Sequence, residues 1–272
     1  MVANSLEDYK VFRDFLEDAC GIILGDNKQY LVSSRLSKLM AEKKIDSLSE
    51  LVKCIKQLSH RGLKEAVVDA MTTNETLWFR DSHPFTIFKE RLLPELNKKN
   101  RGAVRVWSAA CSSGQEPYSL SMLVDECVGT MGRVPVEIIA TDVSRSMLEQ
   151  CRKAEYDGLS LGRGLSQERL KRFFELVQGD VYRVKSEVRN RVRFQALNLM
   201  DSFASLGKFD VVFCRNVLIY FSADLKMDIL RRIHGSLKPG GYLVLGASEG
   251  LAGVNEFYEM VTCNPGIIYR AK

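Results

Sequence analysis

The sequence predicts an all-α N-terminal domain followed by an α/β domain built on a mostly parallel sheet. Apolar residues recur at helical spacing through about the first 70 residues, and no strand-like alternation occurs there. After residue 100, short β-branched runs alternate with helical stretches, which is the pattern of βαβ units. Residues 257–272 contain two strand-like runs around Asn-Pro-Gly, so we expect a hairpin that closes the sheet with an antiparallel strand.

Four helices are expected in the N-terminal domain, which we place at residues 1–72. The helical periodicity covers residues 6–22, 27–45, 48–58 and 63–73. The first of these segments reaches Gly21, a residue type that favours helix C-termini.

The α/β domain is expected at residues 73–272. Parallel strands are predicted at residues 103–110, 136–142, 209–214 and 241–247. Helices between them are predicted at residues 117–128, 144–155 and 223–237.

An insertion interrupts this alternation after the second helix of the sheet domain. It contains a short helix around residues 166–175. Two Arg-rich alternating runs follow, at residues 180–185 and 188–197. They predict a small antiparallel β-subdomain at about residues 156–197, which a plain crossover would not need.

Composition limits the class of protein. With 272 residues, 46% of them hydrophobic, the chain can bury one large core or two smaller ones. No run approaches the roughly 18 apolar residues of a membrane span. The N-terminal stretch carries acidic residues and lacks the apolar segment of a signal peptide. We therefore expect a protein that does not insert into the membrane.

Cysteine, histidine and charge limit the chemistry. The seven cysteines form no CxxC pair, which predicts reduced thiols and a cytoplasmic location. The three histidines are too dispersed to predict a metal site. A net charge of +5 favours an acidic partner without requiring nucleic acid.

Ligands of open α/β sheets bind outside the carboxyl ends of the strands, so the residues that follow each strand are informative. After the first strand, Ser112, Ser113 and Gly114 are small enough to let the backbone approach a ligand. Glu116 then faces a cationic ligand group or acts as a helix-start carboxylate. The absence of a GxGxxG fingerprint argues against a nicotinamide dinucleotide.

The second strand ends at Asp142, whose carboxylate can accept both hydroxyls of a ribose. The alternative is a helix N-cap, although Ser144 is better placed for that role. Later in the chain, the amide of Asn198 can pair with a base edge. Arg215 and Asn216 follow the third strand, and Tyr220 lies close behind them.

These strand-end groups, with a parallel sheet closed by an antiparallel strand, indicate S-adenosylmethionine. Over nearly its whole length the chain resembles the chemotaxis receptor methyltransferases of the CheR family. The resemblance is carried by "TTNETLWFRD", "VWSAACSSGQEPYSL", "IIATDVS", "NL", "FDVVFCRNVLIYF" and "LKPGGYLVLGASE". It implies a Rossmann-like methyltransferase sheet with a small antiparallel β-subdomain insertion, preceded by an all-α domain.

The resemblance also implies the reaction. A protein-glutamate O-methyltransferase would transfer the methyl group of S-adenosyl-L-methionine to glutamate side chains of methyl-accepting chemotaxis receptors, leaving S-adenosyl-L-homocysteine and adapting bacterial chemotaxis signalling. Residues 72–81 would fold over the cofactor. The implied cofactor contacts are Asn74, Thr76, Arg80, Glu116, Asp142, Asn198, Leu199, Arg215 and Asn216. Arg80 and Tyr220 match the two side chains nearest the transferred methyl.

The partner implied by the family is the set of acidic cytoplasmic helices of the receptors. Arg35 and Lys38 lie three residues apart, on one face of a basic helix, and are expected to contact the receptor. The alternative is that this face is simply solvated. We expect a monomer with no nucleic-acid partner.

Two rival functions stay open at this point. A nucleic-acid methyltransferase is compatible with the basic isoelectric point, but Asn-Pro-Pro-Tyr and Pro-Cys motifs are absent. A catalytically inactive binding module is disfavoured because Arg80, Asp142 and Tyr220 are present. Cys111 and Cys214 are interpreted as small core residues rather than nucleophiles.

Overall fold

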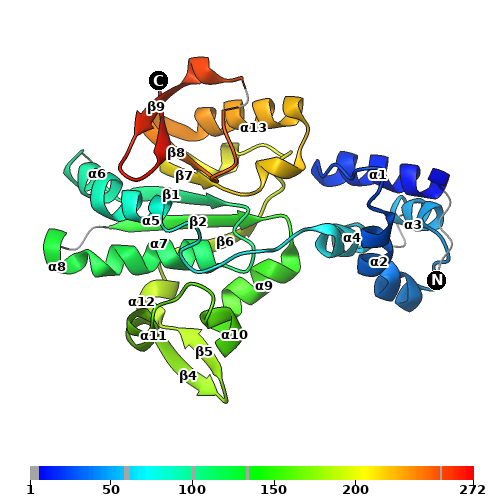
Figure 1. Ribbon diagram of the computed structural model, residues 1–272, viewed down its shortest axis with the longest axis horizontal. Helices are drawn as coiled ribbons and strands as arrows, with labels where there is room; N and C mark the ends of the chain where they lie inside the picture. Colours follow the sequence, from blue (N-terminus) through cyan, green and yellow to red (C-terminus); the bar gives the residue numbers. More distant parts are fainter. Residues whose placement is uncertain (1–5, 58–61, 100–101, 133–134, 252) are drawn as a thin grey trace.

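The computed structural model describes residues 6–57, 62–99, 102–132, 135–251 and 253–272 (Figure 1). Its N-terminal domain contains α1 (Leu6–Cys20), α2 (Gln29–Lys43), α3 (Leu48–Ile55) and α4 (Leu63–Met71). These helices enclose a core of their own, to which Phe12, Leu36, Leu51 and Val67 each contribute a buried side chain. Figure 1 shows this domain, in blue and cyan, beside one end of the central sheet.

The central sheet has the strand order β6-β2-β1-β7-β8-β10-β9. Its strands are β1 (Val104–Ala109), β2 (Val136–Asp142), β6 (Val192–Ala196), β7 (Phe209–Cys214), β8 (Leu237–Leu245), β9 (Tyr258–Thr262) and β10 (Ile267–Ala271). The first five strands in this order, β6, β2, β1, β7 and β8, pair in parallel. In contrast, β10 pairs antiparallel with β8 and β9. The predicted parallel sheet with a closing antiparallel hairpin is thus confirmed.

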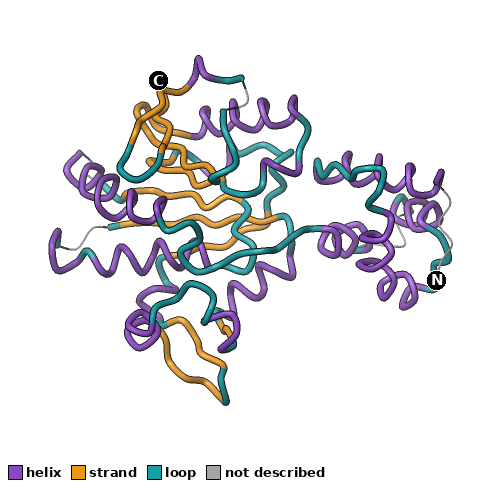
Figure 2. The backbone as a smooth tube through the Cα atoms, viewed as in Figure 1, coloured by secondary structure: helices purple, strands orange, loops and turns teal. Residues whose placement is uncertain are grey.

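Helices cover both faces of the central sheet, as Figure 2 shows in purple around the orange strands. They are α5 (His83–Ile87), the π-helical η2 (Phe88–Leu92), α6 (Leu93–Lys99), α7 (Gln115–Glu126), α8 (Val128–Met131), α9 (Arg145–Lys153) and α13 (Ala223–Ser236). Short 3-10 turns are η3 (Ala204–Leu206), η4 (Leu218–Tyr220) and η5 (Asn255–Phe257). No helix in the described ranges is long and apolar enough to cross a membrane.

Alternation along the buried strands divides the interior into two cores. Val106 and Phe213 pack with η2, α7 and α9 on one face. Their neighbours Trp107 and Val212 pack with α13 on the other face. Successive residues of a strand point to opposite faces, which explains why these strands are apolar throughout rather than alternating.

The small β-subdomain is a separate antiparallel sheet in the order β3-β5-β4. It contains β3 (Glu155–Tyr156), β4 (Phe174–Gln178) and β5 (Val181–Val184), with α10 (Gly158–Leu161), α11 (Gln167–Phe173) and α12 (Ser186–Arg189). Figure 1 shows it below the central sheet.

One predicted member of this subdomain is wrong. The run at residues 188–197 begins in α12 and then forms β6, which pairs in parallel with β2 at the edge of the central sheet. Val192 is buried in the main core and Phe194 packs against it. An alternating pattern shows that a strand has one buried face, but it does not show which sheet the strand joins.

The fourth parallel strand begins earlier than its predicted start at residue 241. β8 begins at Leu237, directly after α13, and includes the Pro-Gly-Gly segment. The strand accommodates it through a register shift against β7, between Phe209 and Val211.

Candidate active site

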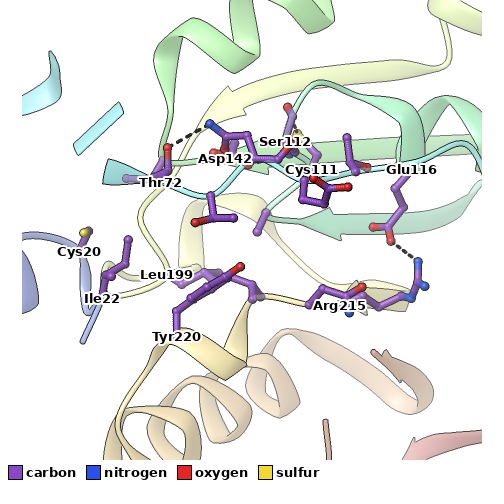
Figure 3. Close-up of a pocket in the computed structure, with 18 of the residues that line it drawn as sticks. Cys20, Ile22, Thr72, Cys111, Ser112, Glu116, Asp142, Leu199, Arg215 and Tyr220 are labelled. Atoms are coloured by element: carbon purple, nitrogen blue, oxygen red, sulfur yellow. Dashed lines mark hydrogen bonds and ion pairs between the residues drawn. The ribbon is translucent and has the colours of Figure 1, made fainter. Parts of the chain in front are cut away.

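A cavity lies beside the carboxyl ends of β1, β2 and β7, and the segment between the two domains covers it (Figure 3). The space between its walls is about 920 Å³, part of it open to solvent. The ten side chains that the sequence nominated for cofactor binding and catalysis all line it: Asn74, Thr76, Arg80, Glu116, Asp142, Asn198, Leu199, Arg215, Asn216 and Tyr220.

Asp142 is the buried carboxylate at the end of β2. One oxygen accepts the backbone N–H of Ser112 at 2.7 Å, and the other accepts that of Ser144 at 2.9 Å. Burial raises the pKa of Asp142, and these backbone N–H donors partly oppose the shift. Each carboxylate oxygen retains capacity for a further hydrogen bond, so ligand hydroxyls can still be accepted. Ser144 caps α9 by accepting the N–H of Met147, as predicted.

The loop after β1 uses left-handed backbone at Ala110, Ser112 and Gly114. Ser112 lines the cavity, whereas Ser113 and Gly114 do not. A Cβ on Gly114 would lie 2.9 Å from the Tyr156 hydroxyl and 3.0 Å from the Cys151 sulfur. The glycine therefore permits close packing beneath the loop, while Cys111 and Ser112 line the cavity.

Arg215 forms a buried charge network at one end of the cavity. Its guanidinium pairs with Glu116 at 2.8 Å and with Asp81 at 2.8 Å, and it also donates to the Arg80 carbonyl at 2.8 Å. The other Glu116 oxygen accepts the Ser108 hydroxyl at 2.7 Å. Glu116 is thus an ion-pair partner within the protein. Arg215 Nε is buried and has no partner among the described residues, which leaves a donor for an anionic ligand group.

The opposite end of the cavity is closed by the N-terminal domain. Cys20, the last residue of α1, and Ile22, two residues beyond it, line the cavity at this end (Figure 3). The Ile23 N–H donates to the Tyr220 carbonyl at 3.0 Å. The sequence did not predict that Cys20 and Ile22 line the cavity. The pattern of a helix shows which of its faces is buried, but it does not show which distant part of the chain that face contacts.

Asn198 connects the same two parts of the chain. Its amide nitrogen donates to the Ala19 carbonyl at 2.8 Å, and its amide oxygen accepts the Met200 N–H at 3.1 Å. These contacts fix the orientation of the amide, which leaves one N–H for a ligand acceptor.

The segment from Thr72 to Asp81, here called the strap, crosses the cavity. Arg35 of α2 donates to the Met71 carbonyl at 2.7 Å and to the Thr72 carbonyl at 3.0 Å. Lys38, in contrast, is 90% exposed. The structure therefore separates two residues that the sequence had grouped as receptor contacts.

The β-subdomain contacts the strap from the other side. The Trp78 N–H donates to the Arg163 carbonyl at 3.1 Å, and the Arg163 side chain pairs with Glu75. The Trp78 ring packs edge-to-face on Tyr156 and Phe174, with centroids 4.9 and 5.4 Å apart. Both flanking units thus hold the strap over the cavity.

The side chain of Arg80 is directed back along the strap. It is half-buried, lines the cavity and donates to the Glu75 carbonyl at 2.8 Å. The adjoining backbone is unusual, because Phe79, Asp81 and Ser82 all have positive φ values. Such conformations cluster at functional sites and persist only where surrounding contacts enforce them.

Cys20, Cys111 and Cys214 are buried thiols. Cys111 and Cys214 belong to the two cores, as predicted, and burial raises the pKa of each thiol well above its usual range. Burial likewise raises the pKa of Cys20 to about 11. In the described ranges no group of three histidine, cysteine or acidic side chains could hold a metal ion, and His60 lies outside those ranges.

The cavity fits S-adenosylmethionine in its chemistry. Two carboxylates, Asp142 and Glu116, suit ribose hydroxyls and positive charge, and the unpaired Arg215 Nε suits an anionic group. Apolar side chains of Ile22 and Leu199 provide a surface for a base. The fold and the cavity define a Rossmann-like, S-adenosylmethionine-dependent methyltransferase.

The family follows from comparison with known proteins. Residues 74–267 match the family described as CheR methyltransferase, SAM binding domain. Residues 7–72 match CheR methyltransferase, all-alpha domain. The chain belongs to the CheR methyltransferase family.

Similar proteins cover nearly the whole chain. Chemotaxis protein methyltransferase 1 of Pseudomonas aeruginosa is 63% identical, over 97% of this chain and 98% of that protein. Chemotaxis protein methyltransferase Cher2 of Pseudomonas putida is 59% identical, over 97% and 98%. Among solved structures, the N-methyltransferase NodS of Bradyrhizobium japonicum with S-adenosyl-L-homocysteine is 14% identical, covers 75% of this chain and 94% of that chain, and has a TM-score of 0.40.

The chain is therefore a chemotaxis methyltransferase that uses S-adenosylmethionine. The nucleic-acid and inactive-module alternatives are not favoured by these relationships.

Proposed function

We propose that this enzyme methylates glutamate side chains on the cytoplasmic helices of methyl-accepting chemotaxis receptors and so adapts chemotaxis signalling. It would act in the cytoplasm, as a monomer. The observation that carries the proposal is the presence of both Arg80 and Tyr220 in the walls of a cavity covered by the strap. A guanidinium and a phenol suit an incoming carboxylate, and neither is required for binding a nucleobase.

The reaction requires alignment of the carboxylate with the methyl group rather than acid–base catalysis. A glutamate carboxylate has an ordinary pKa of about 4.3, so it is ionised at neutral pH and needs no general base. S-adenosylmethionine supplies a methyl group activated by its positively charged sulfur. Arg80 would hold the carboxylate through charge-assisted hydrogen bonds, and Tyr220 would orient it through its hydroxyl. Correct alignment of two bound reactants lowers the barrier by several kcal/mol, about 7–11 in the best intramolecular cases.

The remaining cavity residues are assigned to binding. Asp142 would accept the ribose hydroxyls, and Asn198 with Leu199 would contact the adenine. Glu116, Arg215 and Asn216 would contact the methionine part, with Asn74 and Thr76 contributing from the strap. The structure already satisfies many of these groups internally, which pre-orients them for a ligand.

Receptor contact would fall on the exposed face of α2. Lys38 is exposed, and its amine lies 4.0 Å from the Glu42 carboxylate. An exposed ion pair at this separation contributes little to stability. Lys38 is therefore available to an acidic receptor helix. Arg35, which hydrogen-bonds to the strap, would act on the receptor only secondarily.

The test is incubation with methyl-labelled S-adenosylmethionine and either a receptor cytoplasmic fragment or tRNA. We expect alkali-labile label on the receptor fragment alone, because methyl esters hydrolyse readily in base. A fragment whose modified glutamates are replaced by glutamine is the control and should accept no label. Alkali-stable label, or label on tRNA, would exclude the proposal.

A further inference from the structure

Glu249 lies in the turn after β8, and both of its carboxylate oxygens accept backbone N–H groups. Oε2 accepts from Asn216 at 2.7 Å and from Gly246 at 2.9 Å. Oε1 accepts from Leu218 at 2.8 Å and from Val217 at 3.0 Å. Three consecutive amides of one loop thus share a single side chain as acceptor.

That loop follows β7 and carries several groups of the active site. Arg215, Asn216, Val217 and Tyr220 line the cavity, whereas Glu249 does not. The loop backbone is irregular, since Asn216 has a φ of 57°. Buried amides without an acceptor are costly, so the conformation of this loop depends on the carboxylate behind it.

The topology of the sheet explains why a residue so far along the chain reaches this loop. β7 and β8 pair in parallel up to Cys214 and Leu245, so the segments after them leave the same edge side by side. Gly246 lets them approach, because a Cβ there would lie 2.6 Å from Glu249 Oε2 and 2.9 Å from the Asn216 nitrogen.

We propose that Glu249 is a positioning residue for methyl transfer, which fixes the loop from Arg215 to Tyr220 in its reactive geometry. It acts through Tyr220 and does not touch the reactants. The inference rests on the proposed role of Tyr220 in aligning the receptor carboxylate. Misplacement of a reacting group by about 1 Å can cost on the order of 100-fold in rate, so a residue that only holds the loop can govern turnover.

Glu249→Gln is the sharpest perturbation because it keeps the shape. A glutamine amide presents one oxygen and one donor group, so two of the four N–H groups lose their acceptor and face a donor. We expect kcat to fall about 10- to 100-fold. The receptor KM should change by less than about threefold. The affinity for S-adenosylhomocysteine should fall by a smaller factor than kcat does, because Asn216 belongs to the same loop.

Three further variants test whether a loss of kcat arises from the altered loop rather than from general destabilisation. Glu249→Asp keeps two oxygens and should recover part of the lost kcat. Glu249→Gln combined with Tyr220→Phe should lose little more than the worse single variant, because both act on one alignment step. Asp210→Asn is the matched control: it lies in the same strand as Cys214, is 3% exposed, and accepts from Arg105 N at 2.8 Å and from Lys238 Nζ at 2.7 Å. It should lower the melting temperature and leave kcat unchanged.

The wild-type enzyme is measured first on the receptor fragment, and failure there would remove the proposed function and, with it, this inference. With an active wild type, an unchanged kcat in folded Glu249→Gln overturns the inference alone. Equal loss of kcat in Asp210→Asn, or multiplicative losses in the double variant, also overturns it. If Glu249→Gln does not fold, Glu249→Asp and Gly246→Ala are measured instead. Unfolding of all three would assign Glu249 a purely structural role.

Discussion

Replacing Arg35 by methionine should loosen the strap and weaken cofactor binding. Arg35 belongs to α2, yet its guanidinium donates to the Met71 and Thr72 carbonyls and to the Thr73 hydroxyl, at 2.7, 3.0 and 3.2 Å. Methionine retains a long unbranched stem, so packing along α2 is largely kept and the hydrogen bonds are lost. Lys38→Met is the matched control, because Lys38 lies on the same helix and is 90% exposed.

The magnitude follows from these bonds. Hydrogen bonds to a charged group contribute about 1.5–3 kcal/mol each. Arg35 is half-buried, and the released carbonyls regain water, so we expect the lower figure, about 1.5 kcal/mol, for the whole set. If the cofactor binds only under a closed strap, this corresponds to at most about a tenfold loss of affinity.

Calorimetric titration with S-adenosylhomocysteine measures this loss, and receptor methylation gives KM for each variant. Arg35→Met should show weaker cofactor binding, whereas Lys38→Met should bind the cofactor normally and show a raised receptor KM that depends on salt. Wild-type cofactor affinity in Arg35→Met, with a raised receptor KM, would refute the assignment. Arg35 would then be the receptor contact that its sequence position suggested.

Four other outcomes are expected. Asp142→Ala should weaken S-adenosylhomocysteine binding by about 1.5–3 kcal/mol in calorimetry. Because burial raises the pKa of Asp142 and the ribose needs the ionised form, wild-type affinity should fall with decreasing pH already above the ordinary aspartate value of about 3.9, and Asp142→Asn should remove that dependence. Arg80→Ala should lower kcat far more than cofactor affinity in methylation kinetics; the reverse pattern would reassign it to binding. Gly114→Ala should lower the melting temperature, since its φ is +96° and its Cβ would meet Cys151 at 3.0 Å; an unchanged melting temperature would show that the loop adapts.

Local patterns in the sequence determined the class of fold and the acidic and basic residues at the strand ends. Hydrophobic periodicity follows from how a helix or strand exposes its side chains, so it can be recognised from neighbouring residues alone. Parallel strands bring their carboxyl ends to one edge, which predicts that Glu116, Asp142 and Arg215 line one cavity, as they do in the structure. The resemblance to a known family supplied the strap residues.

The tertiary structure decided the partners of these residues. Residues 192–196 belong to the central sheet rather than to the subdomain. Alternation of apolar and polar residues indicates that a strand has one buried face, but it does not indicate which strand lies beside it. Arg35 hydrogen-bonds to the strap rather than facing a partner. Glu249 accepts hydrogen bonds from the loop after β7, and nothing in the sequence of that loop predicts this contact. The amide of Asn198 meets the carbonyl of Ala19 across 179 positions of the chain. Such contacts depend on how whole elements pack, and no short stretch of sequence encodes that packing.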